Sequence, residues 1–296
     1  MSTERHAPDR PCYAAGPYYV AAGGEREAIL AACAGGLAVM LTGPTGCGKT
    51  RLVRHVAAVL RRPLVTVSCH DELTASDLLG RYLVVGGDVR WMDGPLTSAV
   101  RQGAVCYLDE VAEARRDTLA VLHSLLDDRR ELYLDRTGES IRAADGFVLM
   151  ASYNPESRTL LKELKPSFRQ RFVTLRVDYL PAGREAEVVA HESGVSPEIA
   201  RRLASAARAL RRAGHAGIEP PSTRLLVAAA RLVVSGLPLD TAVRLGMVNP
   251  LSVEGPVALA LDELLFAEGV LDRPVAGAPV AGAPGPSGPR RPGAAR

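Results

Sequence analysis

A phosphate-binding motif near the start of the chain carries the clearest chemistry in the sequence. The eight residues GPTGCGKT fit the pattern G-x-x-x-x-G-K-[ST] and lie between an apolar run, LAVML, and an amphipathic helical pattern. In that context, the backbone N–H groups of a glycine-rich turn and of a helix N-terminus bind phosphate groups. The nucleotide-binding residues that the motif predicts are Gly43, Pro44, Thr45, Gly46, Cys47, Gly48, Lys49 and Thr50.

Three residues of this motif have distinct expected roles. Lys49 would reach the β- and γ-phosphates of a nucleotide, and the Thr50 hydroxyl would ligate Mg²⁺. Cys47 is expected only to fill space, because a free cysteine usually behaves as a small hydrophobe. Lys49 is also one of only three lysines among the 36 basic residues of the chain, which marks it as a place that needs a compact charge.

A second constellation is the pair of carboxylates that ends the apolar run AVCYLDE. Burying one carboxylate is costly, and burying two together costs more unless a cation lies nearby. A magnesium ion at the phosphate-binding turn would supply that cation. We therefore expect Asp109 to hold the ligand shell of Mg²⁺ and Glu110 to orient or deprotonate the attacking water. An acidic surface turn is the alternative interpretation of the pair taken alone.

Two further polar residues are candidates for contact with the nucleotide. Asn154 ends the run FVLMASYN and could bind the γ-phosphate or the attacking water, although an asparagine before a proline is also a common turn residue. Arg224 lies in the first turn of a predicted helix that Ser222 caps, where a cation opposes the helix dipole unless an anion is near. A nucleotide phosphate would be such an anion, and an exposed arginine is the alternative.

A basic segment, KELKPSFRQR, precedes the last strand-like run. It gathers four cations within ten residues: Lys162, Lys165, Arg169 and Arg171. One of the arginines could be presented across a subunit boundary to the nucleotide of a neighbouring copy. A solvated basic loop is the alternative interpretation.

Two kinds of element must position these residues. Between residues 37 and 179, five short apolar runs alternate with helical stretches, a pattern typical of parallel strands that are buried on both faces in an α/β fold. The runs are Leu37–Leu41, Leu64–Cys69, Ala104–Leu108, Phe147–Ser152 and Phe172–Val177. After Pro181 the sequence predicts only helices, at about 184–192, 197–213, 223–235, 239–246 and 256–268.

The expected domain organisation follows from these patterns and from the two ends. A flexible N-terminus (1–17) precedes an α/β core (18–180), a small helical domain (181–272) and a tail (273–296). Of the last 23 residues, 17 are Pro, Gly or Ala, a composition typical of disordered segments.

Composition excludes several classes of protein. A hydrophobic share of 47% with 23% charged residues is typical of a globular protein. A net charge of +3 and only 4% aromatic residues argue against a nucleic-acid motor. The first ten residues are polar, no apolar run reaches the length of a membrane span, and the five cysteines form no C-x-x-C pair. We therefore expect a cytoplasmic protein that neither enters a membrane nor binds nucleic acid.

Longer segments carry a more specific resemblance. GPTGCGKT, CHDELTASDLLGRYL, WMDGPLTSAVRQGAVCYLDEV, SYNP, LLKELKPSFRQRF and PSTRLL occur in this order. Over roughly residues 17–255 the sequence resembles the CbbQ/NirQ/NorQ group of MoxR-type AAA+ ATPases. The resemblance implies an AAA+ P-loop NTPase core with a parallel sheet, a small all-helical C-terminal lid domain, and a homo-oligomeric, hexameric ring with ATP and Mg²⁺ between subunits.

The resemblance also assigns roles to individual residues. It implies Walker A at Lys49 and Thr50, Walker B at Asp109 and Glu110, sensor 1 at Asn154, sensor 2 at Arg224, and an arginine finger at Arg171 with Arg169 as a second candidate. It further implies two β-hairpin insertions on the ring, at about Leu83–Trp91 and Glu131–Arg142, and both segments have strand–turn–strand spacing.

The function that the resemblance implies is ATP-driven remodelling. Members of the family act with a von Willebrand factor A-domain partner to activate a client metabolic enzyme, either Rubisco or nitric oxide reductase. Hydrolysis would move the lid against the core, and the hairpins would reshape the client. A P-loop small-molecule kinase, a nucleic-acid motor and a gas-vesicle-type AAA+ assembly protein are the alternatives.

Overall fold

The computed structural model describes residues 16–155, 164–213, 219–251 and 255–271. The predictions for the chain before residue 16, for the Pro/Gly/Ala-rich tail and for Lys162 lie outside these described residues.

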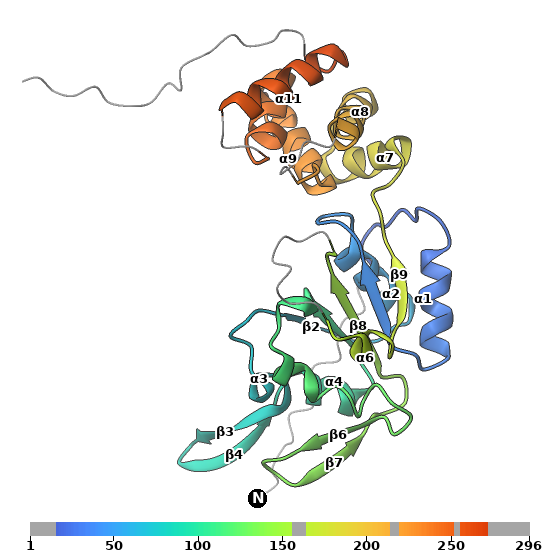
Figure 1. The fold of residues 1–296 in the computed structure, drawn as a ribbon, viewed down its shortest axis with the longest axis vertical. Helices are drawn as coiled ribbons and strands as arrows, with labels where there is room; N and C mark the ends of the chain where they lie inside the picture. The colour runs from blue at the N-terminus through green and yellow to red at the C-terminus, as the bar shows by residue number, and fades with distance from the viewer. Residues whose placement is uncertain (1–15, 156–163, 214–218, 252–254, 272–296) are drawn as a thin grey trace, which may run out of the picture.

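A five-stranded parallel sheet forms the centre of the larger part of the molecule (Figure 1). Its strand order is β2-β5-β8-β1-β9. Because the strands are parallel, crossover connections that contain helices join them. The strands are β1 (Val39–Thr42), β2 (Leu64–Ser68), β5 (Val105–Asp109), β8 (Val148–Tyr153) and β9 (Val173–Arg176). All five predicted strands are confirmed, with ends that shift by at most two residues.

Burial differs between the centre and the edges of the sheet. The central strands β5, β8 and β1 are buried along nearly their whole length, as the unbroken apolar runs predict. The same prediction is wrong for β2 and β9, where most residues are partly or fully exposed and Val173 is 45% exposed. These two strands form the sheet edges, and each has one flank without a neighbouring strand.

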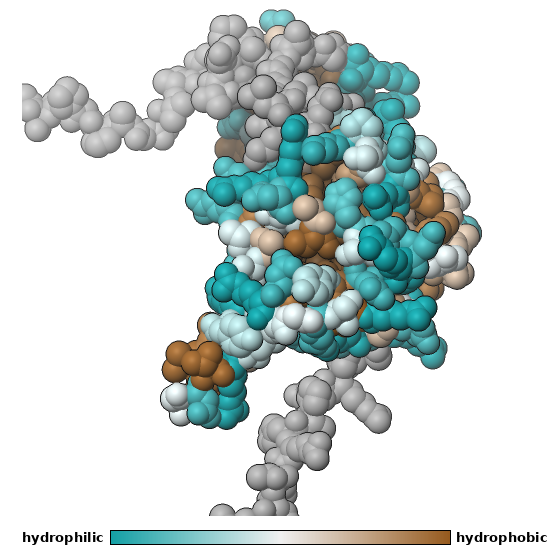
Figure 2. Space-filling model, turned by 60° about the horizontal axis from the view of Figure 1, so that its bottom comes forward, coloured by the Kyte–Doolittle hydropathy of each residue, from teal (hydrophilic) through white to brown (hydrophobic). Residues whose placement is uncertain are grey.

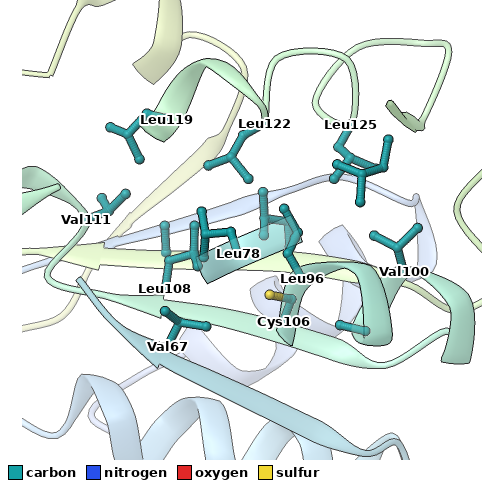
Figure 3. Packing of buried hydrophobic residues seen from close by; sticks show 14 of the residues in the cluster. Val67, Leu78, Leu96, Val100, Cys106, Leu108, Val111, Leu119, Leu122 and Leu125 are labelled. Atoms are coloured by element: carbon teal, nitrogen blue, oxygen red, sulfur yellow. The ribbon is translucent and has the colours of Figure 1, made fainter. Parts of the chain in front are cut away.

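Helices cover both faces of the sheet and divide its core into two clusters. One face packs against α1 (Glu25–Ala34) and α2 (Lys49–Val59), and the other against α3 (Ala75–Leu79), α4 (Pro95–Gln102) and α5 (Arg116–Ala120). Alternate residues of β5 join opposite clusters, because successive side chains of a strand point to opposite faces. Cys106 and Leu108 therefore lie among the leucines of α3–α5 (Figure 3), while Val105 and Tyr107 face α1 and α2.

Two β-hairpins extend from this core at the end that is far from the helical domain (Figure 1). They are β3–β4 (Gly80–Val85 and Asp88–Asp93) and β6–β7 (Glu131–Leu134 and Glu139–Arg142), which confirms both predicted hairpins. The first turns at Gly86 and Gly87, whose φ angles of 62° and 91° suit a tight hairpin turn. Arg101 joins the two hairpins through ion pairs to Asp93 (3.0 Å) and Glu139 (2.6 Å).

Short helices link the remaining parts of the core. The residues after β5 form a single 3-10 turn, η1 (Val111–Glu113), and α6 (Pro166–Arg169) precedes β9. A capping box begins α3, where Thr74 and Asp77 exchange hydrogen bonds between side chain and backbone.

The last part of the chain is helical and has a core of its own. It comprises α7 (Ala182–Ser193), α8 (Pro197–Ala213), α9 (Thr223–Val234), α10 (Leu239–Val243), the π-helical turn η2 (Arg244–Val248) and α11 (Gly255–Ala267). The buried centre of this cluster includes Val189, Leu203, Leu226, Met247 and Leu265. The structure has a helix in each of the segments that the sequence predicts as helical after Pro181. No helix in the described part of the chain combines the length and the apolar character that crossing a bilayer requires.

Candidate nucleotide-binding site

The phosphate loop, residues 43–50, connects β1 to α2 along a path that requires glycine. Gly46 and Gly48 have φ angles of 68° and 102°, in the left-handed region that other residues rarely adopt. A Cβ atom at Gly43 would lie 1.9 Å from the carbonyl oxygen of Val177. The loop therefore packs directly against the backbone that follows β9, and only a residue without a side chain fits there.

Lys49 and Cys47 have different surroundings in this loop. Lys49 is the first residue of α2, and its ammonium group donates to the carbonyl oxygens of Gly43 (2.8 Å) and Pro44 (2.9 Å). Its charge thus lies at a helix N-terminus, where anions bind most readily. The Cys47 thiol is buried and donates to the Val177 carbonyl, and burial raises the pKa of this thiol. A thiol of this kind is not a nucleophile near neutral pH.

Asp109, at the end of β5, is surrounded by hydroxyl groups. Thr50 Oγ1 donates to Asp109 Oδ2 (3.0 Å), while Ser152 Oγ (2.6 Å) and Tyr107 OH (2.8 Å) donate to Asp109 Oδ1. Burial raises the pKa of Tyr107, so its phenol stays protonated and remains a donor. Thr50 and Asp109 therefore place a hydroxyl and a carboxylate oxygen side by side at the pocket, a donor set of the kind that Mg²⁺ prefers.

Glu110 has an unusual backbone conformation for its residue type. Its φ and ψ angles are 56° and 46°, in the left-handed region, and its backbone N–H donates to Ser152 Oγ (3.3 Å). Strained conformations of this kind concentrate at functional sites. The sharp turn directs consecutive carboxylates differently: Asp109 is held in the hydroxyl network, whereas Glu110 is exposed and lines the pocket.

Asn154 follows β8 and contacts the phosphate loop. Its side-chain amide donates to Thr45 Oγ1 at 3.1 Å. Since β8 lies between β5 and β1 in the sheet, Asn154 and Glu110 come from neighbouring strand ends. Ligands of parallel α/β sheets bind at this carboxyl edge.

These residues line a cavity of about 690 Å³ between the sheet and the helical domain. Pockets for ligands the size of a nucleotide measure about 300–1,000 Å³. One part of its wall is polar and contains the phosphate loop, Asp109, Glu110 and Asn154. Apolar side chains also line it, from residues 17–22, α7 and α9; Tyr18, Tyr19, Val20, Val188 and Val227 are among them.

The helical domain contributes charged residues to the same cavity. Arg224, in the first turn of α9, is exposed and lines the pocket together with Arg231. Ser222 occupies the N-cap position of α9, but the predicted side-chain cap is wrong: its hydroxyl makes no capping hydrogen bond. Arg51 of α2 forms an ion pair with Glu192 of α7 (Nη2–Oε2 3.2 Å), and this hydrogen bond lowers the pKa of Glu192.

Arg169 and Arg171 lie elsewhere. Neither residue is part of the wall of this cavity, and both are exposed. Arg171 Nη1 donates to the carbonyl oxygen of His123 at 3.3 Å, beyond the C-terminal end of α5. The structure therefore brings together the phosphate loop, Asp109, Glu110, Asn154 and Arg224 and leaves the two candidate finger residues outside.

Several residues that support the site were not predicted from the sequence. Ser152 and Tyr107 lie inside apolar strands, and both are fully buried with their hydroxyl groups on Asp109. A serine directly before a strand end was the available signal for Ser152. Tyr179, whose hydroxyl reaches the phosphate loop, and Arg211, which stacks on its ring, gave no local signal because they lie far from the loop in sequence.

The fold and the site define a P-loop nucleotide-binding protein of the AAA class. The family model described as "AAA domain (dynein-related subfamily)" matches residues 38–172. Among solved structures, a RuvB variant of Thermotoga maritima superposes with a TM-score of 0.50 at 18% sequence identity, covering 83% of this chain and 70% of that chain. At that identity the likeness concerns the fold alone.

More specific relatives narrow this class to one family. A second family model, "CbbQ/NirQ/NorQ C-terminal", matches residues 185–267. NorQ of Paracoccus denitrificans is 53% identical over 85% of this chain and 93% of the relative, and the denitrification regulatory protein NirQ of Pseudomonas aeruginosa is 50% identical over 84% and 96%. CbbQ of Hydrogenophilus thermoluteolus is 46% identical over 83% and 92%. The chain belongs to the CbbQ/NirQ/NorQ family of AAA+ proteins, which confirms the resemblance drawn from its motifs.

Proposed function

We propose that the chain hydrolyses ATP and uses the energy to remodel a partner protein. The observation that carries the proposal is the single cavity that joins the phosphate loop, two acidic residues on a strand end, Asn154 and Arg224. The roles of these residues are our assignment, and the family membership supports it.

Catalysis in this proposal rests on positioning and charge, with no covalent intermediate. Lys49 and the loop N–H groups bind the phosphates, and Asn154 contacts the γ-phosphate or the attacking water. Glu110, exposed on the cavity wall, orients that water and accepts its proton. Thr50 and Asp109 would hold Mg²⁺, which neutralises charge on the phosphate oxygens when bound.

An arginine of a neighbouring copy completes the site. Arg171, or Arg169 beside it, lies outside the cavity of its own chain, which supports a role in trans at a subunit boundary. Closing such boundaries head to tail gives a ring, and six copies are the family expectation. In this arrangement the exposed Arg224 senses the nucleotide from the same chain.

The client side of the molecule is proposed to be the hairpin end. Figure 2 shows an apolar patch at the tip of a projection, and Val84, Val85 and Val89 of β3–β4, which are 48–74% exposed, belong to it. Contiguous exposed apolar side chains mark surfaces that contact other proteins. A von Willebrand factor A-domain partner and a client metabolic enzyme, Rubisco or nitric oxide reductase, are the proposed partners, in the cytoplasm, with neither nucleic acid nor membrane insertion involved.

Two measurements test the proposal. The specific rate of Mg²⁺-dependent ATP hydrolysis should rise with protein concentration, because a site completed in trans works only in the assembled ring. The purified chain with ATP should then raise the activity of one client, Rubisco or nitric oxide reductase, when the A-domain partner is present. An ATPase whose specific rate is independent of concentration would contradict the ring, and an active ATPase that activates neither client would contradict the remodelling role.

A further inference from the structure

Two residues from beyond β9 contact the phosphate loop, one in the connection to the helical domain and one at the start of α9. The Tyr179 hydroxyl, from the connection between β9 and α7, donates to the carbonyl oxygen of Thr45 at 2.8 Å. The N-cap residue of α9, Ser222, packs so closely on Gly46 that a Cβ atom there would lie 2.4 Å from Ser222 Cβ. The loop and the start of α9 are therefore in direct contact.

Tyr179 is in turn held from the helical domain by Arg211 of α8. The guanidinium carbon of Arg211 lies 3.7 Å from the centroid of the Tyr179 ring. A planar guanidinium group stacked on an aromatic face is attracted by the ring quadrupole and also limits the movement of the ring. Arg211 thus covers a face of the same ring whose hydroxyl donates to Thr45.

A buried carboxylate fixes Arg211 and the start of α9 together. Glu185 of α7 is only 1% exposed, and it accepts two hydrogen bonds from Arg211 (2.7 and 2.8 Å) and one from Thr223 Oγ1 (2.6 Å). Arg211 also donates to the carbonyl oxygen of Pro221 at 2.7 and 2.9 Å. Breaking a buried pair of this kind leaves an uncompensated charge, so the arrangement tolerates little displacement.

We propose that Tyr179 is a positioning residue: together with Arg211, Glu185 and Thr223 it holds Arg224 at a set place relative to the phosphate loop. Thr223 directly precedes Arg224, and Tyr179 directly contacts Thr45, so the four residues form a continuous chain of contacts from the phosphate loop to Arg224. This linkage, which we call the Tyr179 linkage, rests on the proposed function, because Arg224 is assigned there as the residue that senses the nucleotide.

A merely structural role for Tyr179 is the competing explanation. In that case the residue would stabilise the junction of the two parts, and its removal would lower stability and activity to the same extent whatever residue stands at position 224. The two explanations differ in how the effects of Tyr179 and Arg224 combine.

The experiment measures ATP affinity with a fluorescent ATP analogue, kcat for hydrolysis and melting temperature in four proteins: the full chain, Tyr179→Phe, Arg224→Ala and the double variant. Tyr179→Phe removes one hydroxyl and keeps the ring under Arg211. We expect kcat to fall about three- to tenfold, the range for loss of one hydrogen bond, with ATP affinity within twofold of the unsubstituted chain. In the Arg224→Ala background the same substitution should change kcat less than twofold.

Arg211→Lys is the second variant. Lysine keeps a positive charge beside Glu185 but cannot stack a planar guanidinium group on the Tyr179 ring. It should reproduce the kcat effect of Tyr179→Phe, whereas Arg208→Lys, an exposed residue one turn earlier on α8, should not. Equal loss of kcat in both Arg224 backgrounds, or an unchanged kcat in Tyr179→Phe, overturns the proposal. If the unsubstituted chain binds no ATP, the proposed function itself fails. That result differs from an active enzyme in which the kcat losses of Tyr179→Phe and Arg224→Ala simply add.

Discussion

Glu110 shows how one residue separates two neighbouring carboxylates. Asp109 and Glu110 are consecutive, yet only Asp109 enters the network of hydroxyl groups, because the backbone turns into the left-handed region at Glu110 (φ 56°). That conformation costs roughly 1–2 kcal/mol for a residue with a Cβ atom. The hydrogen bond from its amide to Ser152 offsets part of this cost. The strained backbone of Glu110 therefore places its carboxylate on the wall of the cavity.

Glu110→Gln should separate ATP binding from turnover. Glutamine keeps the shape of the side chain and leaves Thr50 and Asp109 intact, but it cannot accept the proton of the attacking water. We expect ATP affinity to be retained and turnover to fall roughly 10²- to 10⁴-fold, measured as phosphate release under saturating ATP. Glu187→Gln, an exposed position on α7 outside the cavity wall, is the matched control and should leave both quantities unchanged. Full activity in Glu110→Gln would remove Glu110 from its proposed role.

Ser152→Ala should affect both stability and hydrolysis. The Ser152 hydroxyl is fully buried, donates to Asp109 and accepts from the Glu110 amide, so alanine leaves each of these two groups with one partner fewer. We expect the free energy of unfolding in urea to fall by about 1–3 kcal/mol and hydrolysis to fall with it. Ser235→Ala removes an exposed hydroxyl and should change stability by less than about 0.5 kcal/mol. Equal stability losses in the two variants would contradict the network.

At the scale of elements, the phosphate loop and the start of α9 form one packed unit. Gly46 has φ 68°, and Ser222 occupies the space that a side chain at Gly46 would need. Loop and helix are therefore in direct contact, and a shift of one relative to the other would disturb this contact. A change in the loop on nucleotide binding would reach Arg224 through it.

Gly46→Ala tests this contact, because the new methyl group would collide with Ser222 and would also strain the backbone. ATP affinity, measured by titration calorimetry, should fall at least about tenfold. Adding Ser222→Gly removes the collision and should restore part of the affinity, but the strain of about 1–2 kcal/mol would remain. Gly194→Ala has a similar φ (75°) with open space around it, so it should cost stability and leave ATP affinity intact. No recovery in the double variant would argue against the contact.

Helices and strands could be predicted where the pattern that marks them lies within their own stretch of sequence. Apolar runs located all five strands of the sheet, whereas the family resemblance placed both hairpins, in segments with strand–turn–strand spacing. Burial of β2 and β9 was not predictable, because strand order decides which strands are edges and the sequence does not state that order. Similarly, the loop motif identified Lys49, whereas the residues of the Tyr179 linkage come from the connection after β9 and from α7, α8 and α9, and they meet only after folding.

At the scale of the whole molecule, the position of Arg171 suggests that one chain does not make a complete site. Its side chain is exposed, lies outside the nucleotide cavity and donates to the His123 carbonyl. Burial is the largest cause that lowers the pKa of His123, and the nearby charges of Arg171 and Lys165 lower it further. The imidazole is therefore mostly neutral near pH 7, which avoids a third positive charge next to the proposed finger.

Arg171→Ala should leave ATP affinity at the chain's own site nearly unchanged, because Arg171 does not line that cavity. Catalysis should fall by roughly 10³- to 10⁵-fold, the range for arginine fingers, and Arg171→Lys should not restore it, since a point charge cannot replace the planar fork.

Mixing two inactive variants then decides whether Arg171 acts in trans. Arg171→Ala subunits keep Lys49, and Lys49→Ala subunits keep the finger, so neither protein should hydrolyse ATP alone. In a mixed ring, some boundaries pair an intact phosphate loop with an intact Arg171, and partial activity should return as the two proteins are combined. Co-purification of one variant with an affinity-tagged copy of the other would first establish that the two variants assemble together. If co-assembled rings stay inactive, the role passes to Arg169, and the same mixing with Arg169→Ala decides whether the site is shared between subunits at all.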